Sequence, residues 1–200
     1  MIKKFFYMNK AALLYTINAI AGYIDVPVSD TEATPICEWE YSVEADKLPK
    51  FEEYSAPKHN IICDTYEPVI QYIIRGGNPT AVGYWQQLYR IVGLSHSFIH
   101  EQVTELDVEN ATLEDAVQWY KDFMSKDLYG EDTAWIGYAC FNKILYKAGI
   151  GLCAVKDEAS AKAIGAAAYR RDEKFVDMLV QHITRIPAKY KKTVETTEEQ

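Results

Sequence analysis

Two histidines four residues apart are the side chains of this chain best placed to bind a transition metal. In the segment His96-Ser-Phe-Ile-His100 a helical backbone would put both imidazoles on one face, where they could share one ion. Glu101 and Glu105 could add a carboxylate, and His182 a third nitrogen. The glutamate that a zincin carries between its histidines is absent, and two half-buried histidines near a helix end explain the pattern as well. We therefore expect no tightly bound metal and no other cofactor.

A second arrangement of chemical interest involves Arg90 and His96. They lie six residues apart, which resembles the arginine–histidine pair of helical HEPN-type ribonucleases. The polar residue that those nucleases usually carry beside the arginine is Ile91 here, and Arg90 is also placed to cap the turn before Gly93. A metal-dependent or RNA-cleaving enzyme centred on His96 and His100 is therefore an alternative to the non-enzymatic function that we expect.

Neither the cysteines nor the glycines complete a motif. Cys37, Cys63, Cys140 and Cys153 show none of the close paired spacing that a zinc site or a redox dithiol needs. Cys140 falls within a helical apolar pattern, where a thiol behaves as a small hydrophobic side chain. The pair Gly76-Gly77 lacks the following lysine of a phosphate-binding loop.

The composition indicates one folded, acidic domain. The chain has 200 residues, of which 48% are hydrophobic and 13% aromatic, enough to bury a core. A net charge of −8 and a pI near 5.1 weigh against direct binding of nucleic acid. Arg170 and Arg171, with Lys174 nearby, are a local basic exception. They fit a solvated helix end, and they are also candidate interaction residues.

The N-terminus imitates a secretion signal in part. Lys3-Lys4 precedes an apolar run, and Ala19-Ile20-Ala21 resembles a signal-peptidase site. Polar residues at Asn9-Lys10 and at Asn18 interrupt the run. No stretch reaches the roughly 20 apolar residues of a membrane-spanning helix. We expect a cytoplasmic protein with no membrane partner.

The elements that would position these residues are mostly helices. Between Asn110 and Ile186 the pattern predicts about three consecutive helices. The first begins at the capping-box-like segment Thr112-Leu-Glu-Asp115, and the second begins at Asp132-Thr133. Gly149 stands where the second helix needs a left-handed residue, and Lys143 and Lys147 lie toward its negative end.

The third helical region has Asp157 or Ser160 as candidate caps. An alanine-rich run from Ala161 to Ala168 follows and would allow close helix packing. Apolar residues then continue at helical spacing from Phe175 to Ile183, until Pro187 stops the helix. The apolar residues at helical spacing are expected to share one core, which contains Leu88, Trp135, Ile136, Ile144, Phe175 and Leu179.

The segment Cys37-Glu-Trp-Glu-Tyr-Ser-Val-Glu44 alternates strictly, which is the period of a half-buried strand. We expect Trp39 and Tyr41 to point inward, and its partner strand to run from His59 to Cys63. The outer face carries the acidic residues Glu38, Glu40 and Glu44, which are further candidate interaction residues.

The remaining elements complete a predicted architecture. An amphipathic helix is predicted from Tyr7 to Tyr23, another helix from Pro68 to Ile74, and more helix from Thr80 to about Leu106. The fold class is thus mainly α (α+β), a helical bundle with a small N-terminal two-stranded β element. We expect a single helical domain over residues 1–186, with the β element near 36–64, and a charged tail over 187–200.

The N-terminal third resembles the head-to-tail adaptor proteins of short-tailed phages, the tail tubular protein A type. The resembling segments begin with Thr16-Ile-Asn-Ala-Ile-Ala, Ile24-Asp-Val-Pro-Val-Ser29 and Trp39-Glu-Tyr-Ser-Val-Glu44, and continue with Asn60-Ile-Ile62, Tyr66-Glu-Pro68 and Tyr72-Ile73. They occur in the order of that family, although the family's long helix between Ser29 and Trp39 is missing. The resemblance implies a structural subunit of a virion connector.

The C-terminal half, from Asp127 to Ile183, is similar to the end of a Fic domain in Asn142 and in Lys147-Ala-Gly149. The histidine, Gly-Asn-Gly and arginine of the Fic motif are absent. The residues at the aligned positions are Asp127, Asp132, Thr133, Ala134 and Trp135. This resemblance implies no nucleotidyl transfer.

These observations favour a non-enzymatic helical protein that mediates protein–protein interaction or assembly. Fifteen tyrosines and four tryptophans suit interfaces, and the expected partners are other protein subunits or further copies of the chain. If the chain is phage-encoded, it would work in the host cytoplasm or in the virion, as a head–tail adaptor. An alternative is an inhibitor or immunity protein that covers a partner's basic site with Glu38, Glu40 and Glu44.

Overall fold

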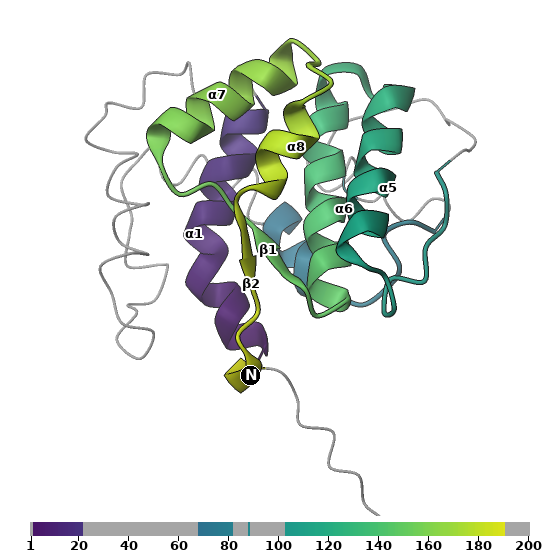
Figure 1. The fold of residues 1–200 in the computed structure, drawn as a ribbon, viewed down its shortest axis with the longest axis vertical. Coiled ribbons are helices and arrows are strands. Elements are labelled where there is room, and N and C mark those ends of the chain that lie inside the picture. Colours follow the sequence, from purple (N-terminus) through teal and green to yellow (C-terminus); the bar gives the residue numbers. More distant parts are fainter. Residues whose placement is uncertain (1, 22–67, 82–87, 89–102, 191–200) are drawn as a thin grey trace, which may run out of the picture.

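The computed structural model describes residues 2–21, 68–81, 88 and 103–190, which form a mainly helical body with one small sheet (Figure 1). The helices are α1 (Ile2–Ile20), α5 (Leu113–Lys126), α6 (Thr133–Lys147), α7 (Glu158–Tyr169) and α8 (Phe175–Val180). Strands β1 (Gly151–Cys153) and β2 (Ile183–Arg185) pair antiparallel, and η3 (Gly130–Asp132) and η4 (Ala188–Tyr190) are short 3-10 helices. The predicted fold class, mainly α with a small β element, is confirmed.

Helix α1 lies inside the body. It begins at Ile2, before the predicted start at Tyr7, and it ends at Ile20, before the predicted end at Tyr23. Every residue from Asn9 to Ile20 is buried, so both sides of this part of the helix are covered. The prediction of an amphipathic helix, with one side facing solvent, was therefore wrong. The side with small residues and the side with large apolar residues are both packed against neighbouring residues. The run that imitates a secretion signal belongs to the core.

Helices α5 and α6 form an antiparallel pair whose starts match the predicted signals. The Thr112 side chain accepts a hydrogen bond from the backbone N–H of Asp115, and the Asp115 carboxylate accepts one from the backbone N–H of Thr112. This reciprocal capping box was predicted. Gly149 has a φ of 66°, which is the left-handed conformation expected after α6. Residues 68–74 are helical, as predicted from Pro68.

Helix α7 packs closely on α1 because its contact side is small. Asp157 caps α7 by accepting a hydrogen bond from the backbone N–H of Ser160, which decides between the two candidate caps. At Gly165 an added Cβ would lie 2.7 Å from the carbonyl oxygen of Ala19. The predicted role of the alanine-rich run in close packing is confirmed.

Strand β2 lies in a part of the chain where helix had been predicted. Helix α8 ends at Val180, and residues Ile183–Arg185 form β2, opposite Gly151–Cys153. The helical prediction from Phe175 to Ile183 was wrong over its last residues. The apolar spacing there is helical, and the pairing of Ile183–Arg185 with β1 overrides it. The predicted β element near 36–64, with Trp39 and Tyr41, lies outside the described residues.

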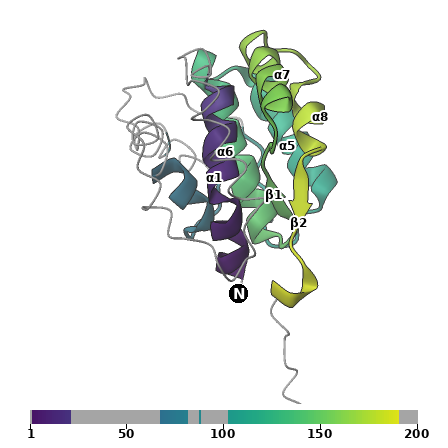
Figure 2. The same cartoon turned by 90° about the vertical axis from the view of Figure 1, so that its left-hand side faces the viewer.

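The core contains the residues that were predicted from the helical spacing of apolar side chains. Leu88, Trp135, Ile136, Ile144, Phe175 and Leu179 are all buried and belong to one hydrophobic cluster. Cys140 and Cys153 are buried free thiols. Figure 2 shows β1 between β2 and the helices, with β2 on the outside of the molecule.

None of the helices in the described ranges is long and apolar enough to cross a bilayer.

Near the C-terminus, Ile186 and Tyr190 are buried, and the Tyr190 ring lies 6.1 Å from that of Phe5. The boundary between the domain and a tail at residue 187 stays a prediction.

Candidate functional site: the corner between α7 and α8

The predicted chemical residues fall largely outside the described part of the chain. His96, His100 and Arg90 lie there, as do Glu38, Glu40 and Glu44. His182 is described, and it is a half-buried residue directly before β2. Among the described residues, no group of three or more His, Cys, Asp or Glu side chains is arranged to hold a metal ion. The described part therefore offers two members of the predicted metal set, His182 and the exposed Glu105.

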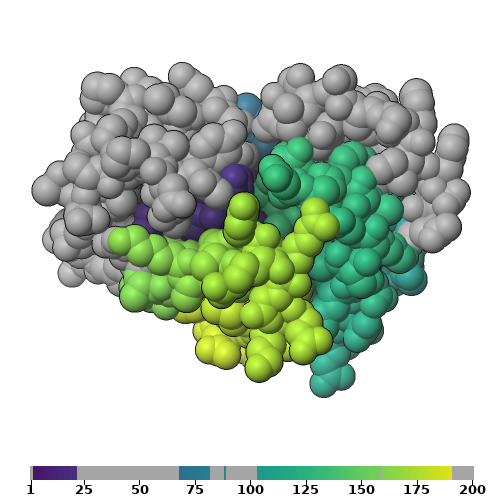
Figure 3. Space-filling view, turned by 90° about the horizontal axis from the view of Figure 1, so that it is seen from above, coloured from purple at the N-terminus to yellow at the C-terminus, as the bar shows by residue number. Residues whose placement is uncertain are grey.

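Arg170 and Arg171 are both exposed, at the turn that joins α7 to α8. Arg170 is the C-terminal cap of α7, and its backbone N–H donates to the carbonyls of Ala166 and Ala168. Tyr169, the last residue of α7, is 80% exposed, the larger value of the two exposed large hydrophobic residues in the described ranges. Figure 3 looks onto this face, where α7 and the segment after it, light green to yellow, lie next to the green surface of α5 and α6.

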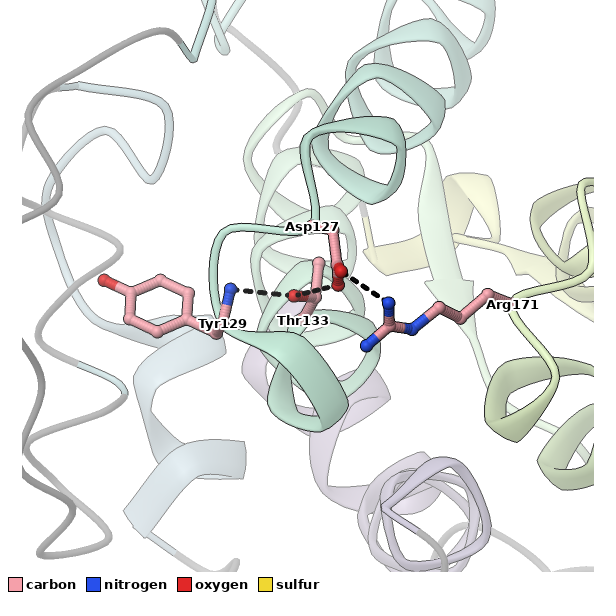
Figure 4. A network of polar contacts seen from close by, with 4 residues as sticks. All are labelled: Asp127, Tyr129, Thr133 and Arg171. Carbon is pink, nitrogen blue, oxygen red and sulfur yellow. Dashed lines mark hydrogen bonds and ion pairs between the residues drawn. The ribbon is translucent and has the colours of Figure 1, made fainter.

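A polar network connects this turn to the loop between α5 and α6 (Figure 4). The Arg171 guanidinium donates to the Asp127 carboxylate at 2.5 Å. The other oxygen of Asp127 accepts from the Thr133 hydroxyl at 3.4 Å, and that hydroxyl accepts from the backbone N–H of Tyr129 at 2.9 Å. The network thus joins the end of α5, the start of α6 and the turn after α7.

Both ends of the ion pair have a strained backbone. Within the described ranges, Asp127 (φ 46°) and Arg171 (φ 54°) are the non-glycine residues with positive φ. This conformation costs a non-glycine residue about 1–2 kcal/mol. The Asp127 and Arg171 side chains are 40% and 54% exposed, so the ion pair stabilises the fold by only about 0–1 kcal/mol. Its main effect is to fix the position of the turn relative to α5.

A second ion pair holds the same corner. Lys121 of α5 lies 2.6 Å from Asp177 of α8, with both side chains partly exposed. On the near side of the turn, the backbone N–H of Lys174 donates to the carboxylate of Asp172. These contacts fix α8 and the turn on α5, and they leave Tyr169 and Arg170 projecting from an ordered support. We call Tyr169, Arg170 and Lys174 the basic corner.

The opposite end of α5 has the reverse charge. Five exposed carboxylates lie on and before its first turn, and residues 103–120 contain no lysine or arginine. We call them the acidic start of α5: Glu105, Asp107, Glu109, Glu114 and Asp115. The Thr112 hydroxyl and N–H hold the pKa of Asp115 below its usual range. A helix of 14 residues separates these carboxylates from the basic corner, which corresponds to about 20 Å.

The buried polar groups of the body hold its elements together. The Lys143 ammonium donates to the carbonyls of Tyr72 (3.1 Å) and Gly76 (3.0 Å), and it lies 3.7 Å from the centre of the Tyr72 ring. Burial lowers the pKa of Lys143 from 10.5 to about 8. Lys143 lies toward the C-terminal end of α6, and its ammonium donates to two carbonyls of residues 72–76.

The buried tyrosine hydroxyls also join elements of the body, and the buried thiols have raised pKa values. Tyr120 donates to the carbonyl of Ala134, and Tyr138 donates to that of Cys153. Burial raises the pKa of both tyrosines and of Cys140 and Cys153. Raised pKa values keep these thiols protonated, which makes them poor nucleophiles.

Comparison with protein-family models, with curated proteins and with solved structures finds no match for this chain. The site is therefore assigned from its geometry. Sequence reasoning found Arg170 and Arg171 but missed Tyr169, and it gave Asp127 no role in the corner. The tyrosine directly before the arginine pair was the available signal, since Tyr and Arg are the residue types that dominate binding energy at interfaces.

Proposed function

We propose that this chain is a non-enzymatic assembly protein that binds further copies of itself head to tail. The basic corner of one copy contacts the acidic start of α5 in the next copy. Because the two surfaces differ, each copy keeps one of each free for another neighbour. Interfaces of this kind close into rings or continue as filaments.

The observation that carries the proposal is the exposure of Tyr169 beside Arg170 on an ordered support. A tyrosine that is 80% exposed leaves most of its ring in water. Burying such a ring against a partner is favourable, and the neighbouring guanidinium can bind a carboxylate. The ion pairs Asp127–Arg171 and Lys121–Asp177 keep the corner in place before binding, which reduces the entropy lost on association.

The acidic start of α5 supplies the complementary charge. Its five exposed carboxylates lie at the other end of α5, so one molecule cannot join its own two surfaces. A neighbouring copy can. The net charge of −8 favours a basic patch as the contact point between copies, because most other faces repel each other.

The resemblance of the N-terminal third to short-tailed phage adaptors agrees with such a function. A subunit of a virion connector is a structural protein that assembles with copies of itself. Of the resembling segments, Thr16-Ile-Asn-Ala-Ile-Ala and Tyr72-Ile73 lie in the described part, and both contribute to the core. A place in a phage virion is therefore included in the proposal.

Size-exclusion chromatography with light scattering tests the proposal. The wild-type protein should have a mass that is a multiple of 22.9 kDa. Tyr169→Ser combined with Arg170→Glu should reduce it to a monomer, while Lys3→Glu, the same charge reversal at the far end of the body, should not. A chain that combines Arg170→Glu with Glu109→Lys and Glu114→Lys should assemble more readily than Arg170→Glu alone, because the new carboxylate of the corner then faces two lysines in place of two glutamates.

Two results would count against the proposal. One is a wild-type monomer at high concentration and low salt. The other is an oligomer that the changes at Tyr169 and Arg170 leave intact, which would place the interface elsewhere.

A further inference from the structure

Strand β2 has one edge that no described residue covers. The hydrogen bonds from Ile186 N–H to the Ile150 carbonyl and from Ala154 N–H to the His182 carbonyl fix the register of the β1–β2 pair. In this register Thr184 faces β1, and the backbone groups of Ile183 and Arg185 face the other way. Within the described residues, no hydrogen bond engages the N–H or C=O groups of Ile183 and Arg185.

The other edge of the sheet shows how such groups are satisfied inside this protein. On β1 the Cys153 N–H donates to the Asn142 side chain at 2.7 Å, and the Cys153 carbonyl accepts from the Tyr138 hydroxyl at 2.7 Å. The Val155 N–H donates to the Thr16 hydroxyl at 2.8 Å. Side chains of α1 and α6 therefore close the β1 edge, whereas β2 lies on the outside of the body in Figure 2.

Basic residues gather at the Arg185 end of this open edge. Arg185 and Lys189 are exposed, and neither α1 nor residues 178–190 contain an Asp or Glu. Lys3, in the first turn of α1, lies at the same end, because Tyr190 of η4 contacts Phe5 and Met8 of α1. Hydrogen bonds from Ser160 and, to a smaller extent, the charge of His182 lower the pKa of Asp157, so a carboxylate lies near His182 at the opposite end of the strand. The edge is thus basic at one end, in a chain of net charge −8.

We propose that the open edge of β2 binds an extended acidic segment of a partner protein by adding it as a third strand. Backbone groups of the segment would pair with those of Ile183 and Arg185, which is the strand-addition mode of peptide recognition. A carboxylate opposite Arg185 would reach its guanidinium. An apolar residue two positions along would lie on the same side, over the half-buried Ile183.

The charges select this partner over a second copy of β2. An antiparallel pair of two β2 strands would place Ile183 of each copy opposite Arg185 of the other, so the two Arg185 side chains would take neighbouring positions on one face, which is unfavourable. The basic corner takes no part in this edge. Binding at β2 is therefore independent of the assembly proposed above, and the two proposals are tested with different variants.

A labelled five-residue probe, Thr-Glu-Thr-Val-Thr, tests the proposal by fluorescence anisotropy with the full chain. The wild-type protein should bind it at least tenfold more tightly than Thr-Lys-Thr-Val-Thr. Methylation of the Glu and Val backbone nitrogens of the probe should weaken binding at least tenfold, since those groups pair with the edge. This second comparison needs no protein variant, so its result does not depend on the folding of one.

Two variants of the protein complete the test. Arg185→Pro removes an outward N–H and no β1–β2 hydrogen bond, because edge strands accept proline at such positions. It should weaken binding at least tenfold with an unchanged circular dichroism spectrum. Arg185→Gln keeps the N–H, and it should weaken binding by a smaller factor that disappears at high salt. Tyr169→Ser with Arg170→Glu should leave peptide binding unchanged.

Three results would overturn the proposal. One is equal affinity for the Glu and Lys probes. Another is full affinity for the methylated probe. The third is a wild-type dimer that Arg185→Pro dissociates and that does not bind the acidic probe, because β2 would then pair with itself.

Discussion

Replacing Lys143 with methionine should remove a pH dependence of stability that the wild-type protein has above neutral pH. The buried ammonium of Lys143 has a pKa of about 8 in the folded protein, lowered from 10.5 mainly by burial. Between these two values the unfolded chain binds more protons at this position than the folded one. The free energy of unfolding therefore rises with pH over this range, through the contribution of Lys143.

The two pKa values set the size of the effect. A change in pKa from 10.5 to about 8 corresponds to about 3 kcal/mol in total, at about 1.4 kcal/mol for each factor of ten in proton affinity. Only part of it is reached in a practical range. Between about pH 7 and about pH 9.5, the contribution of Lys143 should grow by about 2 kcal/mol.

Other buried groups act in the opposite direction. Burial raises the pKa of Cys140, Cys153, Tyr120 and Tyr138, so the unfolded chain loses those protons first and stability falls as the pH rises. This background is common to the wild type and the variant. The measured quantity is therefore the difference between the two proteins at each pH.

Urea unfolding, followed by circular dichroism under reducing conditions, provides the measurement. The free energy of unfolding of the wild type, relative to that of Lys143→Met, should increase by about 2 kcal/mol between about pH 7 and about pH 9.5. Lys126→Met, on α5, serves as a control that should follow the wild type. If the difference in free energy of unfolding between the wild type and Lys143→Met stays constant over this range, the pKa of Lys143 is not lowered by burial in the folded protein.

Two further predictions concern single contacts of the fold. Gly165→Ala should destabilise the protein by about 1–3 kcal/mol, because the new methyl group would lie 2.7 Å from the Ala19 carbonyl oxygen. Without that clash the change would stabilise a helix by about 1 kcal/mol, so the sign of the shift in the urea midpoint decides the matter. Thr112→Ala should cost about 1 kcal/mol by removing the capping box, and Thr112→Ser should restore most of it in the same assay.

The helices could be predicted where local signals specify them. The capping box at Thr112, the left-handed Gly149 and the cap at Asp157 each depend on neighbouring residues alone, and each was found. The buried stripe containing Trp135 and Ile144 follows from helical periodicity. These features are encoded within a few residues, which is why sequence reasoning reaches them.

The features that were missed depend on distant parts of the chain. Each strand of the sheet has three residues, too few for an alternating pattern to be recognised, and its partner is about 30 residues away. Lys143 looked like a helix-end cation, but it contacts a carbonyl 71 residues away. The ion pair between Asp127 and Arg171 spans 44 residues, so the ordered support of the basic corner was not visible in the sequence.

Disulfide trapping between copies tests the head-to-tail assembly most directly. In a background with Cys37→Ser and Cys63→Ser, a chain carrying both Arg170→Cys and Glu114→Cys should form a ladder of covalent multimers under mild oxidation. Each single-cysteine variant should stay monomeric on the same non-reducing gel, since its cysteine faces a different surface on the neighbour. Monomers from the double variant, or dimers from Arg170→Cys alone, would contradict the assembly.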